Sequence, residues 1–178
     1  MYTKGIAKGC RPVPAGGHFY PPLIPKRNKP LYARNMMIRP SRPEDGARVI
    51  AIWRDAVDAT HDFLTREDRL ALDDLVSGFL PEAPLLLAVD ADDRPLGFML
   101  IDGGHMEALF IDPAHRGTGV GAALLRHGLS LHPQMTTDVN EQNAQAVGFY
   151  EHMGFARTGR SALDGQGRPY PLIHLAYS

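Results

Sequence analysis

The stretch "ALFIDPAHRGTGVGAALLRHGL", residues 108–129, contains three successive parts that decide the fold. An apolar run ends at Pro113, three glycines alternate at Gly117, Gly119 and Gly121, and an apolar segment of helical period follows. This order predicts a strand, a glycine turn and a helix that begins at the turn. The free backbone N–H groups of the turn and of the helix start would then meet in one place, an arrangement that binds anions.

The spacing of the glycines excludes two other phosphate-binding motifs. A Walker A loop ends in Gly-Lys-Ser/Thr, and this turn has no lysine. The dinucleotide fingerprint is G-x-G-x-x-G, whereas the glycines here give G-x-G-x-G. On the glycines alone, two interpretations remain equally open: an anion site to which Arg116 adds charge-assisted hydrogen bonds, and a turn without a ligand.

The composition is that of an ordinary globular protein. The 178 residues are 44% hydrophobic and 22% charged with a formal net charge of -1, so the basic excess typical of nucleic-acid binders is missing. The single cysteine, Cys10, excludes an internal disulfide, and no His or Cys spacing predicts a metal site. No segment has the roughly 20 apolar residues of a membrane span and no secretion signal is present, so we expect a cytoplasmic protein without membrane partners.

The sequence divides into an extension and one domain. Residues 1–36 are dense in Pro, Gly and basic residues without any period, which predicts a flexible extension or residues added by an upstream start. Patterning begins at Met37, and Ser41–Glu44 has the spacing of a capping box before a helix that carries Trp53, Val57 and Thr60/His61. A second helix follows Thr65 and ends at Pro81, with an apolar stripe of Leu72, Leu75, Val76, Phe79 and Leu80.

The rest of residues 37–178 alternates strands and helices. The pattern predicts the order β-α-α-β-β-β-α-β-α-β-β, which is a mixed sheet of the α/β class. After the two helices we expect strands at 85–90, 96–102, 105–112 and 135–140, two late strands around 164–169, and helices at 120–131 and 143–153.

A second motif lies in "NEQNAQAVGFYEHMGF", residues 140–155. Asn143, Ala146, Tyr150 and Met153 fall on one face of the expected helix, with Asn143 and Tyr150 about 10 Å apart along its axis. A polar group and a phenol on one stripe could line an elongated ligand. The alternative is a core helix whose tyrosine is merely half-buried.

The two motifs together resemble the GNAT superfamily of N-acetyltransferases. The carrying patterns are R-x-x-G-x-G at 116–121 and N-x-x-A-x-x-x-Y at 143–150, and the resemblance covers residues 37–178. The segments "DATHDFL", "FLPEAPLLLAVD" and "VNEQNAQAVGFY" resemble more narrowly a YjaB-like bacterial branch. The resemblance implies a mostly antiparallel central sheet that is splayed between the third and fourth core strands, 105–112 and 135–140, and flanked by helices.

The resemblance also implies acetyl-CoA as the acetyl donor and assigns residues to it. Leu109, Phe110 and Ile111 would offer backbone groups to the pantetheine arm, Asn143 would hold its side, and Tyr150 would face the thioester sulfur. The pyrophosphate would lie on the residues of the glycine turn, which are Arg116, Gly117, Thr118, Gly119, Val120 and Gly121.

Acetyl transfer to a primary amine poses two proton problems. An alkyl amine of pKa about 10.4 is protonated in all but roughly one molecule in 2,500 at pH 7, and the leaving thiolate, of pKa about 8.5, benefits from a donor. Tyr150 suits the donor role. For the base, Glu107 would share the face of Leu109 by strand alternation, although a cross-strand ion pair would also explain it. His61 would contact the acceptor or cap the first helix.

The acceptor itself stays open at this point. A small amine, an amino acid, an antibiotic and a protein amino group all fit an acetyl-CoA-dependent N-acetyltransferase that acts by direct transfer, as a monomer or a homodimer. A non-catalytic acyl-CoA-binding sensor or carrier is the alternative. Release of the CoA thiol across a panel of amines would separate the enzyme from the binder.

Overall fold

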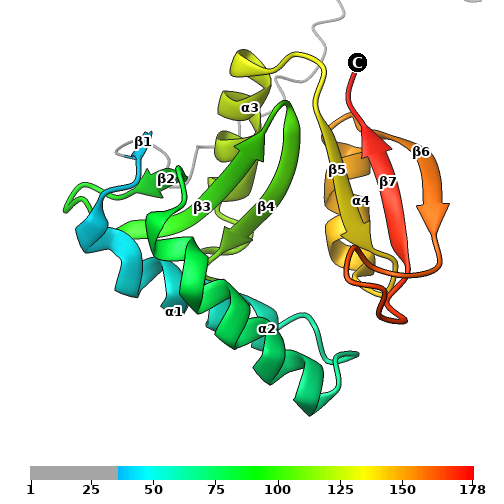
Figure 1. Ribbon diagram of the computed structural model, residues 1–178. Helices are drawn as coiled ribbons and strands as arrows, with labels where there is room; N and C mark the ends of the chain where they lie inside the picture. Colours follow the sequence, from blue (N-terminus) through cyan, green and yellow to red (C-terminus); the bar gives the residue numbers. More distant parts are fainter. Residues whose placement is uncertain (1–35) are drawn as a thin grey trace, which may run out of the picture.

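The computed structural model describes residues 36–178, and the predicted extension, residues 1–36, lies outside the described residues apart from Met36 (Figure 1). The order of elements is the one that the sequence predicts. The strands are β1 (Met37–Pro40), β2 (Leu86–Val89), β3 (Pro95–Asp102), β4 (His105–Ile111), β5 (Thr136–Asn140), β6 (Ala156–Ser161) and β7 (Leu172–Ala176). The helices are α1 (Gly46–Asp58), α2 (Arg66–Phe79), α3 (Val120–Leu131) and α4 (Ala144–His152).

All seven strands join one sheet in the order β1-β2-β3-β4-β5-β7-β6. Neighbouring strands are antiparallel except β4 and β5, which run parallel and pair only at His105 with Thr136 and at Met106 with Thr137. Beyond these two residues the strands diverge, as Figure 1 shows. The predicted α/β class, with a mostly antiparallel sheet splayed between these two strands, is confirmed.

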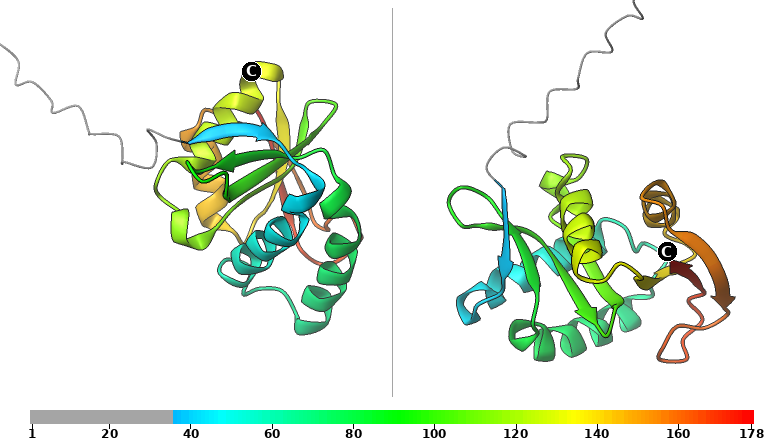
Figure 2. Two further views of the ribbon diagram at one scale, coloured as in Figure 1. Left: turned by 90° about the vertical axis from the view of Figure 1, so that its left-hand side faces the viewer. Right: turned by 90° about the horizontal axis from the view of Figure 1, so that it is seen from above.

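Helices lie on both faces of the sheet, α1 and α2 on one face and α3 and α4 on the other (Figure 2). Successive residues of β3 face opposite ways because side chains alternate along a strand. Phe98 packs in a cluster with Ile52 and Trp53 of α1, whereas Met99 packs in another with Leu124 of α3. The second cluster also includes residues of α4. Helices α3 and α4, which carry the two sequence motifs, are therefore fixed against the sheet by their own apolar side chains.

The start of the domain differs in detail from the predicted capping box. Ser41 is not the cap, because its hydroxyl donates to the Ala83 carbonyl (3.0 Å) and accepts from the Leu85 N–H (3.1 Å). Asp45 supplies the carboxylate that accepts from the Arg42 N–H at 2.8 Å. A serine spaced like a cap thus ties β1 to the start of β2, a long-range contact that local spacing does not encode.

The first two helices also differ from their patterns: α1 ends earlier than predicted, and the apolar stripe of α2 is more exposed. Helix α1 ends at Asp58, so Thr60 and His61 lie in the loop after it. The Thr65 hydroxyl caps α2 by accepting from the Asp68 N–H at 3.1 Å. On α2, Leu75 and Phe79 are 51% and 45% exposed, so only part of the predicted stripe is buried.

Within residues 36–178, no helix is long and apolar enough to cross a membrane.

Gly97 provides a test of the contact between β3 and β4. A Cβ at this position would lie 2.6 Å from Ile111 Cδ1 and 2.8 Å from the Phe110 carbonyl oxygen, so Gly97→Ala must displace backbone. We expect a loss of about 1–3 kcal/mol of unfolding free energy, measured by urea denaturation. The control is Gly78→Ala in α2, where no atom lies within 4 Å and a gain of about 0.5–1 kcal/mol is expected. Equal stabilities of the two variants would contradict this close approach.

Candidate active site

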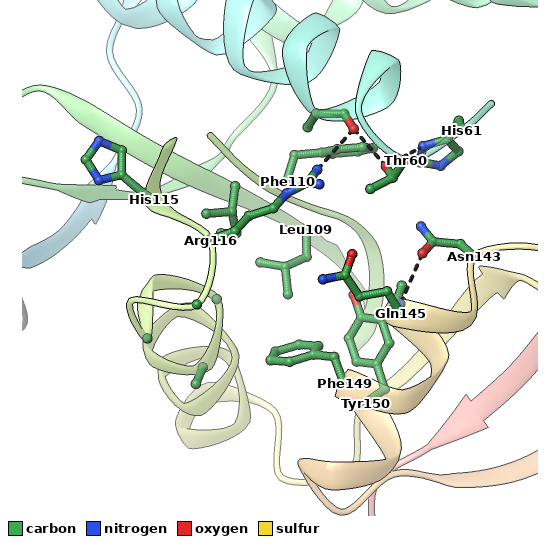
Figure 3. Close-up of a pocket in the computed structure, with 17 residues that line it drawn as sticks. Thr60, His61, Leu109, Phe110, His115, Arg116, Asn143, Gln145, Phe149 and Tyr150 are labelled. Atoms are coloured by element: carbon green, nitrogen blue, oxygen red, sulfur yellow. Dashed lines mark hydrogen bonds between the residues drawn. The ribbon is translucent and has the colours of Figure 1, made fainter. Parts of the chain in front are cut away.

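A cavity of about 350 Å³ opens where β4 and β5 part (Figure 3). Four segments form its wall: the end of α1 with the loop after it, β4, the glycine turn with the start of α3, and α4 with its N-cap. Its lining residues are Ala56, Thr60, His61, Leu109, Phe110, Ile111, His115, Arg116, Gly117, Gly119, Gly121, Ala122, Asn143, Gln145, Ala146, Phe149 and Tyr150.

Most of the site residues predicted from the sequence lie on this wall, and three do not. Thr118 points elsewhere, because its hydroxyl donates to the His115 carbonyl (2.6 Å) and holds the turn together. Val120 is 3% exposed and packs in the core below the cavity. Glu107 lines a different hollow. The side chains of Thr118 and Val120 therefore shape the turn and do not face the cavity.

The glycine turn has the backbone that an anion site requires. Gly117 and Gly119 have φ angles of +71° and +96°, in the left-handed region where other residues cost roughly 1–2 kcal/mol. Gly119 is the N-cap of α3, and no side chain caps this helix. The first N–H groups of α3 thus lie uncapped beside the cavity, where the helix dipole adds partial positive charge.

The edge of β4 that faces β5 offers further backbone groups. After Met106 this edge makes no ladder pairs with β5, and Leu109, Phe110 and Ile111 line the cavity. An unpaired strand edge presents N–H and C=O groups that normally bind another strand. A long ligand that carries amide groups could occupy that place.

Asn143 has a different position from the one that helical spacing predicts. It is the N-cap of α4 and not its first helical residue, because its Oδ1 accepts from the Ala146 N–H at 3.1 Å. The side-chain oxygen is therefore occupied by the helix. The amide NH₂ is the part of the side chain that is left to donate to a ligand.

Tyr150 lines the cavity, and its hydroxyl points toward the Gln145 side chain (Figure 3). The residue is 7% exposed, and its ring packs edge-on against Phe149 and Phe155. Burial raises the pKa of Tyr150 well above that of a free phenol, because the phenolate would lose its hydration. The hydroxyl consequently keeps its proton at neutral pH.

Arg116 reaches across the cavity to α1. Its Nη2 donates to the Ala56 carbonyl (3.1 Å), which also accepts from the Thr60 hydroxyl (2.7 Å). This carbonyl belongs to the last turn of α1, where the helix dipole is negative and a cation is favourable. The guanidinium thus links the glycine turn to α1 in addition to bringing positive charge to the cavity.

Glu107 lies outside the cavity because β4 contains a bulge. Leu100 of β3 pairs with Ala108, but Ile101 pairs with Met106, so Glu107 has no partner in β3. The bulge breaks the alternation that placed Glu107 on the face of Leu109. The exposed Glu107 lines a second hollow together with Leu100 and Ala108.

Several residues of the cavity wall are not predicted from the sequence. Thr60, Gln145 and Phe149 lie on it, and the Gln145 carboxamide projects into the space above Tyr150 (Figure 3). Gln145 and Phe149 lie within the second motif, so its helical pattern could have indicated them. Nothing in the local sequence marks Thr60, which reaches the cavity only because α1 ends beside β4. Within residues 36–178, no cluster of three or more metal-ligating side chains occurs.

Comparison with known proteins agrees with this geometry. Residues 69–167 match a family described as the acetyltransferase (GNAT) domain. The peptidyl-lysine N-acetyltransferase YjaB of Escherichia coli is 61% identical over 140 residues, which cover 79% of this chain and 95% of that protein. The chain belongs to the GNAT acetyltransferase family.

Solved structures of GNAT proteins show the same fold. The solution structure of apo-form YjaB from Escherichia coli superposes with a TM-score of 0.77 at 60% identity, covering 80% of this chain and 97% of the other. A PaiA N-acetyltransferase from Thermoplasma acidophilum, solved in complex with coenzyme A, shares the fold with a TM-score of 0.66 at 18% identity, covering 80% and 98%.

The GNAT family membership decides the reaction class. The chain is an acyltransferase that uses acetyl-CoA as donor and transfers the acetyl group to an amine. The alternative of a non-catalytic acyl-CoA binder finds no support, because these relatives are themselves acetyltransferases.

The backbone of the glycine turn can be tested with two matched glycines. Gly119 and Gly167 both have positive φ, +96° and +79°, and a Cβ at either position would meet no atom within 4 Å. Replacing either by Ala should cost about 1–2 kcal/mol of stability through backbone strain. Only Gly119→Ala, beside the cavity, should weaken coenzyme A binding, by about 10-fold or more, in calorimetry. An equal effect of both variants on coenzyme A affinity would count against a ligand at the turn.

Proposed function

We propose that this enzyme acetylates lysine side chains of proteins. The observation that carries the proposal is the 61% identity to two curated peptidyl-lysine N-acetyltransferases, YjaB of Escherichia coli and of Salmonella typhimurium, over 95% and 97% of their lengths. At such similarity the whole domain is shared and not only the donor site. A lysine amine and an acetyl-CoA thioester would meet in the cavity between β4 and α4.

In this proposal, the backbone holds most of the donor. The uncapped N–H groups from Gly117 to Gly121 would bind the pyrophosphate, since a helix N-terminus with two left-handed glycines forms an anion site. The unpaired edge of β4 at 109–111 would bind the amides of pantetheine as a strand would. The Asn143 NH₂ would donate to a pantetheine carbonyl from the opposite wall, because its oxygen already caps α4.

Tyr150 would act as the general acid. The amine nitrogen attacks the thioester carbonyl carbon, a C–N bond forms and the C–S bond breaks, so that negative charge develops on sulfur. The buried phenol retains its proton until that moment and can then give it to the thiolate. Within the described part of the chain, the hydroxyl has no hydrogen-bond partner and is available to the ligand.

The variant Tyr150→Phe tests this role. The ring and its contacts with Phe149 and Phe155 stay, so stability and acetyl-CoA affinity should change little. The rate constant kcat should fall by about 10²-fold or more if chemistry limits turnover, since the donated proton matters in the transition state. A raised dissociation constant for acetyl-CoA with kcat preserved would instead make the hydroxyl a binding contact.

The second hollow supports a protein acceptor. Its floor is apolar, with Phe79 45% exposed, and its rim carries the exposed carboxylates of Glu82, Asp102 and Glu107. None of the three carboxylates has an ion-pair partner within residues 36–178. Ala108 in this hollow and Phe110 in the cavity are two residues apart on one face of β4. A peptide whose lysine enters the cavity could thus place neighbouring basic residues against this rim.

The triple variant Glu82→Gln, Asp102→Asn, Glu107→Gln tests this docking surface. We expect KM for a lysine peptide with basic flanking residues to rise about 5- to 30-fold, as three exposed ion pairs at roughly 0.2–1 kcal/mol each allow. The value for a lysine amide without flanking residues should not change, and neither should kcat. If KM rises equally for both acceptors, the carboxylates do not act through the flanking residues.

The remaining properties stay predictions from the sequence. The partners that we propose are acetyl-CoA and a protein lysine, without nucleic acid, and the formal net charge of -1 supports this. The cytoplasmic location and the action as a monomer or homodimer are likewise expected from the sequence.

A further inference from the structure

His61 lines the cavity beside the end of α1. It lies in the loop between α1 and α2, and its backbone N–H donates to the Val57 carbonyl at 2.8 Å. Its ring lines the cavity, on the wall formed by the end of α1 (Figure 3). The ring also contacts Phe63 at 5.2 Å between centroids, which limits its rotation.

The hydrogen bonds around Thr60 determine the tautomer of His61. The Thr60 hydroxyl lies 2.7 Å from the Ala56 carbonyl oxygen and 2.9 Å from His61 Nδ1. The Ala56 carbonyl can only accept, and two oxygens 2.7 Å apart without a hydrogen between them would repel each other, so we assign the single hydroxyl proton of Thr60 to the bond with Ala56. The Thr60 oxygen then accepts from His61, and Nδ1 must carry the ring proton.

The opposite nitrogen of the neutral ring, Nε2, therefore carries a lone pair. We propose that His61 is the general base of the transfer and that Thr60 is a positioning residue which fixes its tautomer. In general, a hydrogen bond that holds the proton on one imidazole nitrogen leaves the other nitrogen free to accept a proton. This inference rests on the proposed acetyl transfer to lysine and adds the group that receives the proton.

The protons of the reaction balance as follows. The lysine ammonium first loses one proton to solvent as it is desolvated in the cavity. The amine then attacks the thioester carbon, its second proton passes to His61 Nε2 as the C–N bond forms, and Tyr150 protonates the departing sulfur. The imidazolium finally returns a proton to the Tyr150 oxygen through water, and N-acetyl-lysine and the CoA thiol leave.

The charges around His61 favour a neutral ring. Burial lowers the pKa of His61, and the positive charges of Arg116, beside the glycine turn, and of Arg69, on α2, lower it further. The Val57 carbonyl and the Asp62 carboxylate act in the opposite direction, with smaller effect than burial. The imidazole is thus a free base at neutral pH. The nitrogen becomes much more acidic as its bond to carbon forms, so a base of this strength can accept its proton.

The variant His61→Gln tests the proposal, because Gln keeps a polar side chain of similar reach but cannot accept the proton. We expect kcat to fall about 10²-fold with acetyl-CoA affinity unchanged. In the wild type, kcat should fall as the pH drops through the pKa of His61, which burial holds below that of a free imidazole, because the ring becomes protonated there. His61→Gln should lose this acid limb. The control His152→Gln, on the exposed end of α4, should keep both the rate and the limb.

Two more variants separate a base from a structural residue. Thr60→Val keeps the branched shape and removes the hydroxyl, so kcat should fall less, by about 10-fold, with the acid limb retained. Imidazole added to His61→Ala should restore part of kcat, which a purely structural role would not allow. Loss of the acid limb in Glu107→Gln, or an unchanged limb in His61→Gln, would overturn the proposal.

Assays with two different acceptors distinguish a failure of the proposed general base from a failure of the proposed protein-lysine specificity. Each enzyme is assayed with a lysine peptide and with a small diamine. Wild-type turnover of the diamine alone would contradict protein-lysine acetylation but would still allow the base to be tested. Full activity of His61→Gln on either acceptor would contradict the base alone.

Discussion

The early end of the pairing between β4 and β5 is the constraint on which the site depends. Buried backbone N–H and C=O groups without partners cost roughly 1–3 kcal/mol each, so sheets rarely part in their middle. Here the strands separate after two residue pairs, and the exposed edge of β4 opens onto a cavity. The chain can keep such an edge only where water or a ligand reaches it. A cofactor with amide groups along its length satisfies that requirement.

The fold could be read from the sequence largely because its signals are local. The glycines at 117–121 demand a backbone that other residues adopt only with strain, and Gly117 and Gly119 have positive φ as a result. The strands and helices around them show clear apolar periods, and their order was predicted without error. The positions of Ser41 and Glu107 could not be derived in this way. Ser41 bonds to a segment 42 or more residues away, and Glu107 depends on the pairing of two strands.

Most residues of the candidate site were predicted from the sequence, but many of their positions and contacts were not. The spacing of Asn143 and Tyr150 placed both beside the ligand, and both line the cavity. The sequence did not indicate that Asn143 caps α4 or that Arg116 reaches α1, because each depends on which backbone groups lack partners in the folded chain. His61 was predicted beside the acceptor and lines the cavity, whereas its neighbour Thr60 was not predicted there, because the end of α1 at Asp58 could not be read from the helical pattern. Function therefore depends here on the contacts of helix ends, which sequence periodicity describes least well.

The Ala56 carbonyl, which accepts from both Arg116 and Thr60, has a thermodynamic consequence. In the proposed mechanism, Arg116 lies on the side of acetyl-CoA and Thr60 on the side of the acceptor amine. A phosphate that draws the guanidinium away would leave the carbonyl to Thr60 alone and tighten that bond. The two substrates would then bind with a coupling free energy. Linkage requires this coupling to be reciprocal, so any gain in acceptor affinity caused by acetyl-CoA would return as an equal gain in acetyl-CoA affinity.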